Sequence, residues 1–351
     1  MNAEDESHSN QNPGDEPSLP RSSIDRAIRL SCLQAVLGSI YVSLCSGMFV
    51  IGYALKLGAD NVQIGLLTTI PMICVLGQFI ASRLIESGKS RRKLTIIWST
   101  LTVTSWGAVL AVVPLSAHAG PEARIWAFIG LVTIITLFQH LTNNARASWI
   151  GDLIPARDRG RYFGKLSFYG GIIGVIFTLI GGRFLDHAKV VGLRGFSYVF
   201  LVGAAAGLAS VFLYYPQADV PTRIHRNCDQ FRKLLAETFS NRPLKRMIAY
   251  SIAYYVQMMM AGPFVATYIL RDLETPYLGL SIVIGIAICS NLLAAPFWGR
   301  VVDRYGARPV LVVASIVLCP VPLVWIFVTE PRAVYSILGP VNALAGFIAS
   351  G

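Results

Sequence analysis

Ten long segments of the chain contain no Asp, Glu, Lys or Arg, and short charged stretches separate them. Each is about 17–28 residues long, close to the roughly 20 apolar residues that a helix needs to cross the hydrocarbon core. Because backbone polar groups inside a bilayer must be paired within their own segment, helices are predicted. The segments are 30–55, 61–82, 94–121, 125–145, 166–182, 195–218, 247–270, 275–299, 309–329 and 333–351. The last one ends at Gly351 without a charged flank, so the pattern predicts nine complete spans and part of a tenth.

Composition supports a membrane protein over a soluble one. Of 351 residues, 54% are hydrophobic and only 14% are charged, against about 25% charged in an average soluble domain. The mean hydropathy is +0.56. The predicted fold class is therefore an all-α polytopic membrane protein, which excludes an ordinary soluble enzyme. Residues 1–24 are polar and rich in Ser, Asn and Pro, and are predicted to form a disordered tail.

The basic residues lie mainly on one side of the predicted membrane. Of the 30 Lys and Arg residues, 23 fall on the side that holds the N-terminus, in alternate loops. The positive-inside rule then predicts a cytoplasmic N-terminus and a multi-pass protein of the cytoplasmic (inner) membrane. Topology and contact with the lipid bilayer also account for the net charge of +11, so no nucleic-acid partner is implied.

The second part of the chain repeats the first in the same orientation. Arg29 and Arg246 open spans 1 and 7 at an offset of 217 residues, and Ser82 and Gly299 close spans 2 and 8 at the same offset. Duplicated helix bundles are common in transporters. A second copy would end near residue 435, about three spans later, so we expect the native chain to continue past Gly351. The predicted domains are a six-helix bundle at 25–218, a linker at 219–246 and an incomplete second bundle at 247–351.

The linker carries two local signals. Apolar residues recur at helical spacing with basic and acidic residues between them, which predicts an amphipathic helix on the cytoplasmic membrane face; they are Phe231, Leu234, Leu235 and Phe239. Asn241 and Pro243 then indicate the start of the next helix.

The loop after span 8 identifies a family resemblance. Residues 299–309 read GRVVDRYGARP, which resembles the Gly-xxx-Asp-Arg-x-Gly-x-Arg signature of the major facilitator superfamily. Its matching residues are Gly299, Asp303, Arg304, Gly306 and Arg308. Residues 82–93 look like a degenerate first copy in which Glu86 stands for the aspartate, and residues 152–161 resemble the family's loop after span 4.

The resemblance implies two six-helix bundles that rock about a central site, and hence a secondary transporter of a small organic solute. It also implies a conformational switch, in which Asp303 clamps the start of span 5 near Phe163–Leu166 in one state. Elementary chemistry agrees, because an anion is stabilised at a helix N-terminus. Gly299 is expected where two helices pack closely, and Gly306 is expected in a tight turn.

The resemblance also implies a site lined by spans 1, 4, 7 and 10, where polar residues near mid-membrane are the candidates. These candidates for substrate binding are Gln34, Tyr41, Gln139, His140, Asn143, Tyr254, Gln257 and Asn291. Aromatic, amide and thioether groups there suit a neutral or weakly polar molecule. Each candidate has an alternative role, since intramembrane amides often bond helix to helix and tyrosines often lie in the interface belt.

The sequence carries few signals of ion coupling or of catalysis. No span segment contains Asp or Glu, so His140 is the candidate proton relay, with a bond between helices as its alternative; both a coupling ion and uniport stay open. The six cysteines include no CxxC pair and no HExxH or GxSxG motif occurs, so no metal, cofactor or enzyme activity is expected. The alternative function is a transporter-like membrane sensor or a non-transporting truncated paralogue.

Overall fold

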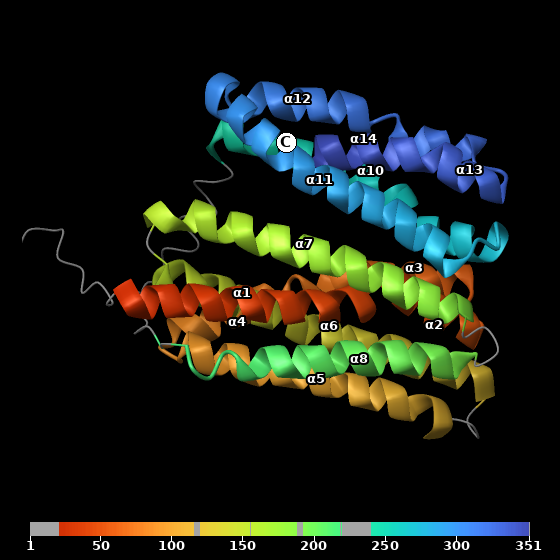
Figure 1. Cartoon of the computed structure of the whole chain (residues 1–351), viewed down its shortest axis with the longest axis horizontal. Helices are drawn as coiled ribbons and strands as arrows, with labels where there is room; N and C mark the ends of the chain where they lie inside the picture. Colours follow the sequence, from red (N-terminus) through yellow and green to blue (C-terminus); the bar gives the residue numbers. More distant parts are fainter. Residues whose placement is uncertain are drawn as a thin grey trace, which may run out of the picture.

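A computed structural model describes residues 21–115, 120–154, 156–187, 192–217, 219 and 240–350. This part of the chain forms helices and turns without a strand, which confirms the all-α polytopic fold (Figure 1). The α-helices are Arg21–Leu44 (α1), Met48–Leu57 (α2), Asn61–Cys74 (α3), Gly77–Glu86 (α4), Arg91–Leu115 (α5), Gly120–Leu153 (α6), Ala156–His187 (α7), Leu193–Phe212 (α8), Arg242–Thr267 (α10), Tyr277–Tyr305 (α11), Ala307–Leu318 (α12), Pro331–Ser336 (α13) and Leu338–Ala349 (α14). A π-helix, η3, spans Tyr268–Asp272, and a 3₁₀-helix, η4, spans Val321–Phe327.

Nine helical stretches among the described residues are long and apolar enough to cross a membrane. The 26-residue α10 lies at the place of the seventh predicted span and begins after Asn241 with Pro243 in its first turn, which confirms the start signal. The described chain begins with α1 at Arg21, inside the predicted disordered tail. The predicted amphipathic linker helix, with Phe231, Leu234, Leu235 and Phe239, falls outside the described residues.

Several predicted spans are helices in two pieces. The first is α1 followed by α2, separated by a break at 45–47 in which Gly47 has φ +55°. The second is α3, which contains Pro71, followed by α4. Proline removes one backbone donor and weakens the turn before it. These breaks leave main-chain groups that side chains must satisfy inside the bundle.

Apolar side chains point outward along much of the bundle. Examples on different helices are Val62, Leu293 and Ile326, which are exposed by 70%, 79% and 70%. A water-soluble protein rarely exposes so many large apolar groups together, whereas lipid tails solvate them. The outer surface therefore supports the membrane-spanning arrangement.

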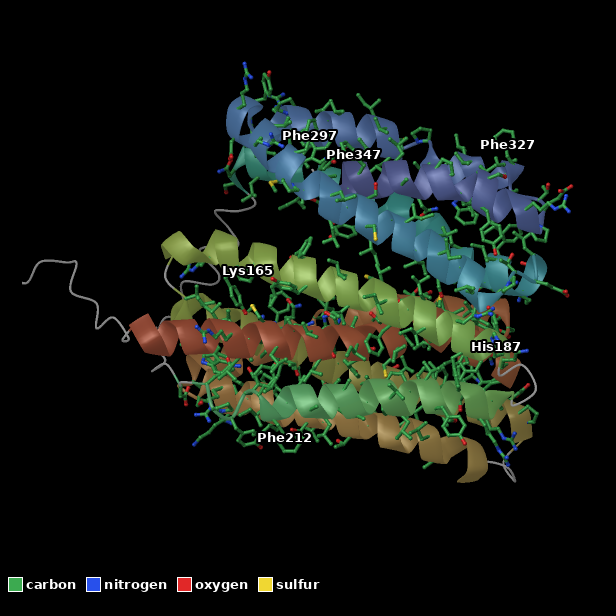
Figure 2. All side chains as sticks on the ribbon, in the orientation of Figure 1. Lys165, His187, Phe212, Phe297, Phe327 and Phe347 are labelled. Carbon is green, nitrogen blue, oxygen red and sulfur yellow. The ribbon has the colours of Figure 1, made fainter. Side chains whose placement is uncertain are left out.

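Helices α7 and α11 run antiparallel and join the two parts of the molecule. In Figure 1 they lie side by side where α7 ends and α11 begins, and they diverge toward the opposite end. We call these the closed end and the open end; the side chains of His187 and Lys165 mark them on α7 in Figure 2. Glycines make the approach possible, because a Cβ on Gly182 would collide with the Ser281 hydroxyl and one on Gly171 would meet Leu292 at 2.7 Å.

The closed end is held by polar bonds between the two parts. The carboxylate of Asp186, near the end of α7, accepts the backbone N–H groups of Tyr277 and Leu278 at 2.8 and 2.9 Å. These are orphan donors in the first turn of α11, where a negative charge is stabilised. Nearby, the guanidinium of Arg271 donates to the Asn61 amide oxygen at 2.8 Å.

An aromatic core supports this end. The ring of Tyr53 on α2 packs edge-on against Phe128 and Phe200, with centroids 5.0 and 5.4 Å apart. Phe196 continues the cluster to Tyr277 of α11, at 5.6 Å. Such edge-to-face pairs stabilise by about 0.5–1.5 kcal/mol each beyond area burial, so the closed end is both polar-bonded and well packed.

Candidate functional site

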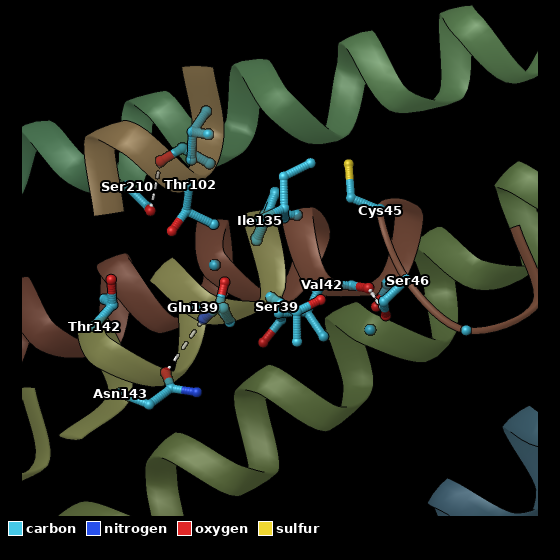
Figure 3. A pocket seen from close by; sticks show the side chains of 18 of the residues that line it. Ser39, Val42, Cys45, Ser46, Thr102, Ile135, Gln139, Thr142, Asn143 and Ser210 are labelled. Atoms are coloured by element: carbon cyan, nitrogen blue, oxygen red, sulfur yellow. Dashed lines mark hydrogen bonds between the residues drawn. The ribbon is translucent and has the colours of Figure 1, made fainter. Parts of the chain in front are cut away.

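A cavity of about 910 Å³ lies inside the helical bundle. All of its lining residues except Gly262 and Ile288 come from the part of the chain before residue 218, on α1, α2, α3, α5, α6, α7 and α8 or in the turns that follow α1 and α8. Its size falls within the usual range of ligand pockets, about 300–1,000 Å³. Figure 3 shows hydroxyl and amide side chains from several of these helices pointing into the same space.

One face of α6 supplies the amides of the cavity. Gln139 and Asn143 both line it, one helical turn apart, and the Gln139 amide donates to the Asn143 oxygen at 3.2 Å (Figure 3). That bond leaves the Asn143 amide N–H groups available to a ligand. Thr142 also lines the cavity and is 5% exposed, yet its hydroxyl has no hydrogen-bond partner in the structure. Because a buried hydroxyl without a partner is costly, such a group favours a ligand.

Helix α1 supplies an aromatic hydroxyl and a second amide. Gln34 and Tyr41 both line the cavity, on the face that the sequence suggested, and both are more than nine-tenths buried. The Tyr41 hydroxyl accepts the indole N–H of Trp106 at 3.0 Å, so the phenol is fixed in place and keeps its own proton for another acceptor. The structure therefore brings four of the sequence candidates together here.

The candidates on α10 lie elsewhere. The Gln257 amide donates to the carbonyl oxygens of Leu318 and Cys319, both at 3.2 Å. The ring of Tyr254 stacks on Tyr250 with centroids 6.3 Å apart. In this conformation, Gln257 thus bonds α10 to the end of α12, Tyr254 packs against a residue of its own helix, and neither lines the cavity.

His140 and Asn291 also lie off the cavity lining. A ring nitrogen of His140 lies 3.1 Å from the carbonyl oxygen of Pro71, beside the break between α3 and α4. This is the helix-to-helix bond that stood as the alternative to a proton relay. Asn291 is on α11, one turn beyond the cavity residue Ile288, but is not among the lining residues.

The signature residues occupy the open end. Gly306 has φ +82° in the turn between α11 and α12, which confirms the expected tight turn. Asp303 is exposed, and no hydrogen bond or ion pair joins it to another described residue. The expected close packing at Gly299 is not present: within the described structure, nothing lies within 4 Å of a Cβ added there. The physical reason is that α7 and α11 have diverged at this end.

The other signature residues lie near helix ends. The Arg304 guanidinium lies over the Tyr305 ring, 5.4 Å from its centroid, and Arg308 lies in the first turn of α12. Helix α4 ends at Glu86, whose side chain is outside the described part of the structure.

Sequence reasoning misses two charged residues, one at the cavity and one at the closed end. The segment 125–145 leaves Arg146 in a loop, but α6 continues to Leu153, so Arg146 lies within the helix and lines the cavity. The segment 166–182 leaves Asp186 beyond span 5, but α7 continues to His187, and Asp186 bonds to the start of α11. A signal for Arg146 was present, since Gln139, Asn143 and Arg146 follow helical spacing on one face.

Comparisons with known proteins agree with this architecture. The multidrug resistance protein MdtG of Serratia proteamaculans (strain 568) is 25% identical over 217 residues, covering 60% of this chain and 51% of that protein. The chain thus spans about half the length of the curated relatives that it matches. Two solved transporter structures have a similar fold. A mutant form of the nucleoside transporter NupG has a TM-score of 0.68 at 15% identity, and the match covers 93% of this chain and 79% of that one. A D-xylose-proton symporter has a TM-score of 0.67 at 15% identity, and the match covers 93% of this chain and 80% of that one.

The family assignment rests on a longer match. The sequence profile of the Major Facilitator Superfamily matches residues 32–351, which include the cavity, the closed end and the signature loop. This multi-pass membrane protein belongs to the Major Facilitator Superfamily.

Proposed function

We propose that this protein is a secondary transporter that moves a small organic solute across the cytoplasmic membrane by alternating access. The observation that carries the proposal is a cavity of about 910 Å³ beside two helices, α7 and α11, that are bonded to each other at one end and diverge at the other (Figure 1). Cavities at the interface of packed helices are the usual binding sites of such carriers. The proposal takes the cavity residues Gln34, Tyr41, Gln139 and Asn143 as the first candidates for solute contact.

The proposed orientation places the open end in the cytoplasm. Most Lys and Arg residues are predicted on the side of the N-terminus, and the start of α7 and the end of α11 lie on that side. The arrangement is then an inward-facing state, with Asp186 and Arg271 bonded at the outer end. We propose the inner membrane as the location, in keeping with the positive-inside rule.

A flux assay tests the proposal. The whole protein is reconstituted in lipid vesicles, and uptake of three radiolabelled solutes is measured. They are uridine and xylose, chosen from the names of the structurally similar transporters, and the organic anion benzoate. Saturable uptake of at least one of them above that of protein-free vesicles is the expected result. Binding of a solute, detected as a rise in melting temperature, with no uptake of that solute would contradict transport and favour the sensor alternative.

The same vesicles test a coupling ion. Uptake is compared with and without an imposed proton or sodium gradient. An ion-coupled carrier accumulates solute above its outside concentration only with the gradient, whereas a uniporter equilibrates it in both cases. His140→Ala belongs in this comparison, because an unchanged pH dependence in that variant would contradict the proton-relay hypothesis.

A further inference from the structure

Arg146 differs from the other described arginines at the open end of the first part, because Arg29 and Arg83 are exposed and the remaining three bond to main-chain carbonyl oxygens. Arg91, Arg92 and Arg159 each donate to main-chain carbonyl oxygens near helix ends, so these guanidinium groups hold the bundle together. Among the described residues, Arg146 donates to no oxygen and pairs with no carboxylate. Its role is therefore not explained by packing or capping.

The position of Arg146 is unusual for an unpaired cation. It is half-buried on α6, between Ala145 and Trp149, which are both 0% exposed, and it lines the cavity. It is the only charged side chain among the lining residues described. A charged group at membrane depth is costly, and such residues usually mark a solute or ion pathway.

Further donors stand beside this guanidinium. Asn143, one turn back on α6, has amide N–H groups left free by its bond from Gln139. Thr142 carries a buried hydroxyl without a partner, although Thr133 and Thr136 on the same helix both donate to the carbonyl four residues earlier. One cation and two neutral donors thus lie on neighbouring positions of one helix, and the cavity supplies no described carboxylate to neutralise them.

We infer that the solute of this cavity is a small organic anion, whose carboxylate or phosphate group binds Arg146 with help from Asn143 and Thr142. The inference rests on the proposed function and names the class of solute that it moves. Guanidinium forms strong paired hydrogen bonds with both kinds of anion. The neutral remainder of the solute would lie toward Gln34 and Tyr41, where the lining holds amide, phenol and aliphatic groups.

The test compares acids with uncharged partners of nearly the same shape. Melting temperatures of the whole protein in detergent micelles are measured with benzoate or benzamide, and with glucose 6-phosphate or glucose. The variants are Arg146→Gln, Arg146→Lys and the control Lys165→Gln, which removes an exposed cation from the same end of the molecule (Figure 2). The two acids separate a carboxylate site from a phosphate site.

We expect at least one acid to raise the melting temperature of the wild-type protein and of Lys165→Gln more than its neutral partner does. Arg146→Gln should weaken that acid's apparent affinity about ten- to a hundredfold, because charged hydrogen bonds are lost. Arg146→Lys should keep part of it, since an ammonium group lacks the paired donors. Without ligand, Arg146→Gln should be as stable as wild type or more so, which a merely structural arginine would not allow.

Three results would overturn the inference: neutral partners that stabilise as well as the acids, an undiminished effect of the acid on Arg146→Gln, or no stabilisation by either acid. Failure of the inference is distinguishable from failure of the proposed function. Uptake of uridine or xylose into vesicles by wild type and Arg146→Gln alike would support transport and contradict only the inference that the solute is an anion. Absence of both binding and uptake for every solute would contradict both.

Discussion

The bond between Asp186 and the first turn of α11 predicts how the closed end responds to a single substitution. Asp186→Ala removes a carboxylate that accepts two backbone N–H groups, at 2.8 and 2.9 Å. Hydrogen bonds to a charged group contribute about 1.5–3 kcal/mol each. Because Asp186 is only half-buried, we take the lower value for each of its two bonds. The closed state should therefore lose about 3 kcal/mol of stability, which lowers the ratio of closed to open populations roughly a hundredfold.

Distances across the closed end measure this ratio. Nitroxide labels are attached at Lys56→Cys and Arg332→Cys, two exposed positions on the two parts of the molecule, in a background without the native cysteines. Double electron–electron resonance then reports short and long distances as separate populations. Asp186→Ala should increase the long-distance population strongly.

The matched control is Asp272→Asn, which removes an exposed carboxylate at the same end. Asp272 pairs only with its neighbour Arg271 in the described structure, at 3.2 Å, and exposed pairs of this kind contribute about 0–1 kcal/mol. Its distance distribution should match that of the unsubstituted protein. Equal distributions in Asp186→Ala and Asp272→Asn would refute the role given to Asp186.

Four further substitutions have defined outcomes in thermal unfolding. Gly182→Ala should destabilise by about 1–3 kcal/mol, because its Cβ would collide with α11, whereas Gly299→Ala meets no described atom within 4 Å and should be neutral or slightly stabilising; equal melting temperatures would contradict this. His140→Ala should cost about 1–2 kcal/mol by removing the bond to the Pro71 carbonyl, and an unchanged melting temperature would count against that bond. Glu274→Gly should stabilise by up to about 1 kcal/mol, since Glu274 has φ +48°; destabilisation would show that its side chain matters more than its backbone.

The charge-free segments predicted the fold well because lipid imposes a strong constraint on composition. Helix starts and turns with local signals were also predictable, as at Asn241 and Gly306. The same rule fails for Arg146 and Asp186, since it ends each span at its first charge. Both helices continue past those residues, because a charge that faces a cavity or caps a neighbouring helix does not face lipid.

The candidate site was only partly predictable for a different reason. Helical spacing tells which residues share a face, but not which neighbour that face meets. The polar faces of α1 and α6 meet the cavity, whereas Gln257 of α10 meets α12. The breaks at Gly47 and after Cys74 coincide with a glycine at positive φ and follow Pro71, but a single Gly or Pro within an apolar segment does not by itself predict a break.

The antiparallel packing of α7 and α11 bears on the energy profile of a transport cycle. Asp186 lies in the last turn of α7, where α11 begins, and Asp303 lies in the last turn of α11, at the end where α7 begins. A tilt that parts one pair of helix ends brings the other pair together. We expect this opposite tilt to bring Asp303 to the N-terminus of α7. Each state would then give up one contact between a carboxylate and a helix N-terminus and gain another of the same chemistry, so the two states would be close in free energy. A cycle between two such states is readily reversible, and the direction of net flux is then set by the gradients of the solute and of any coupled ion.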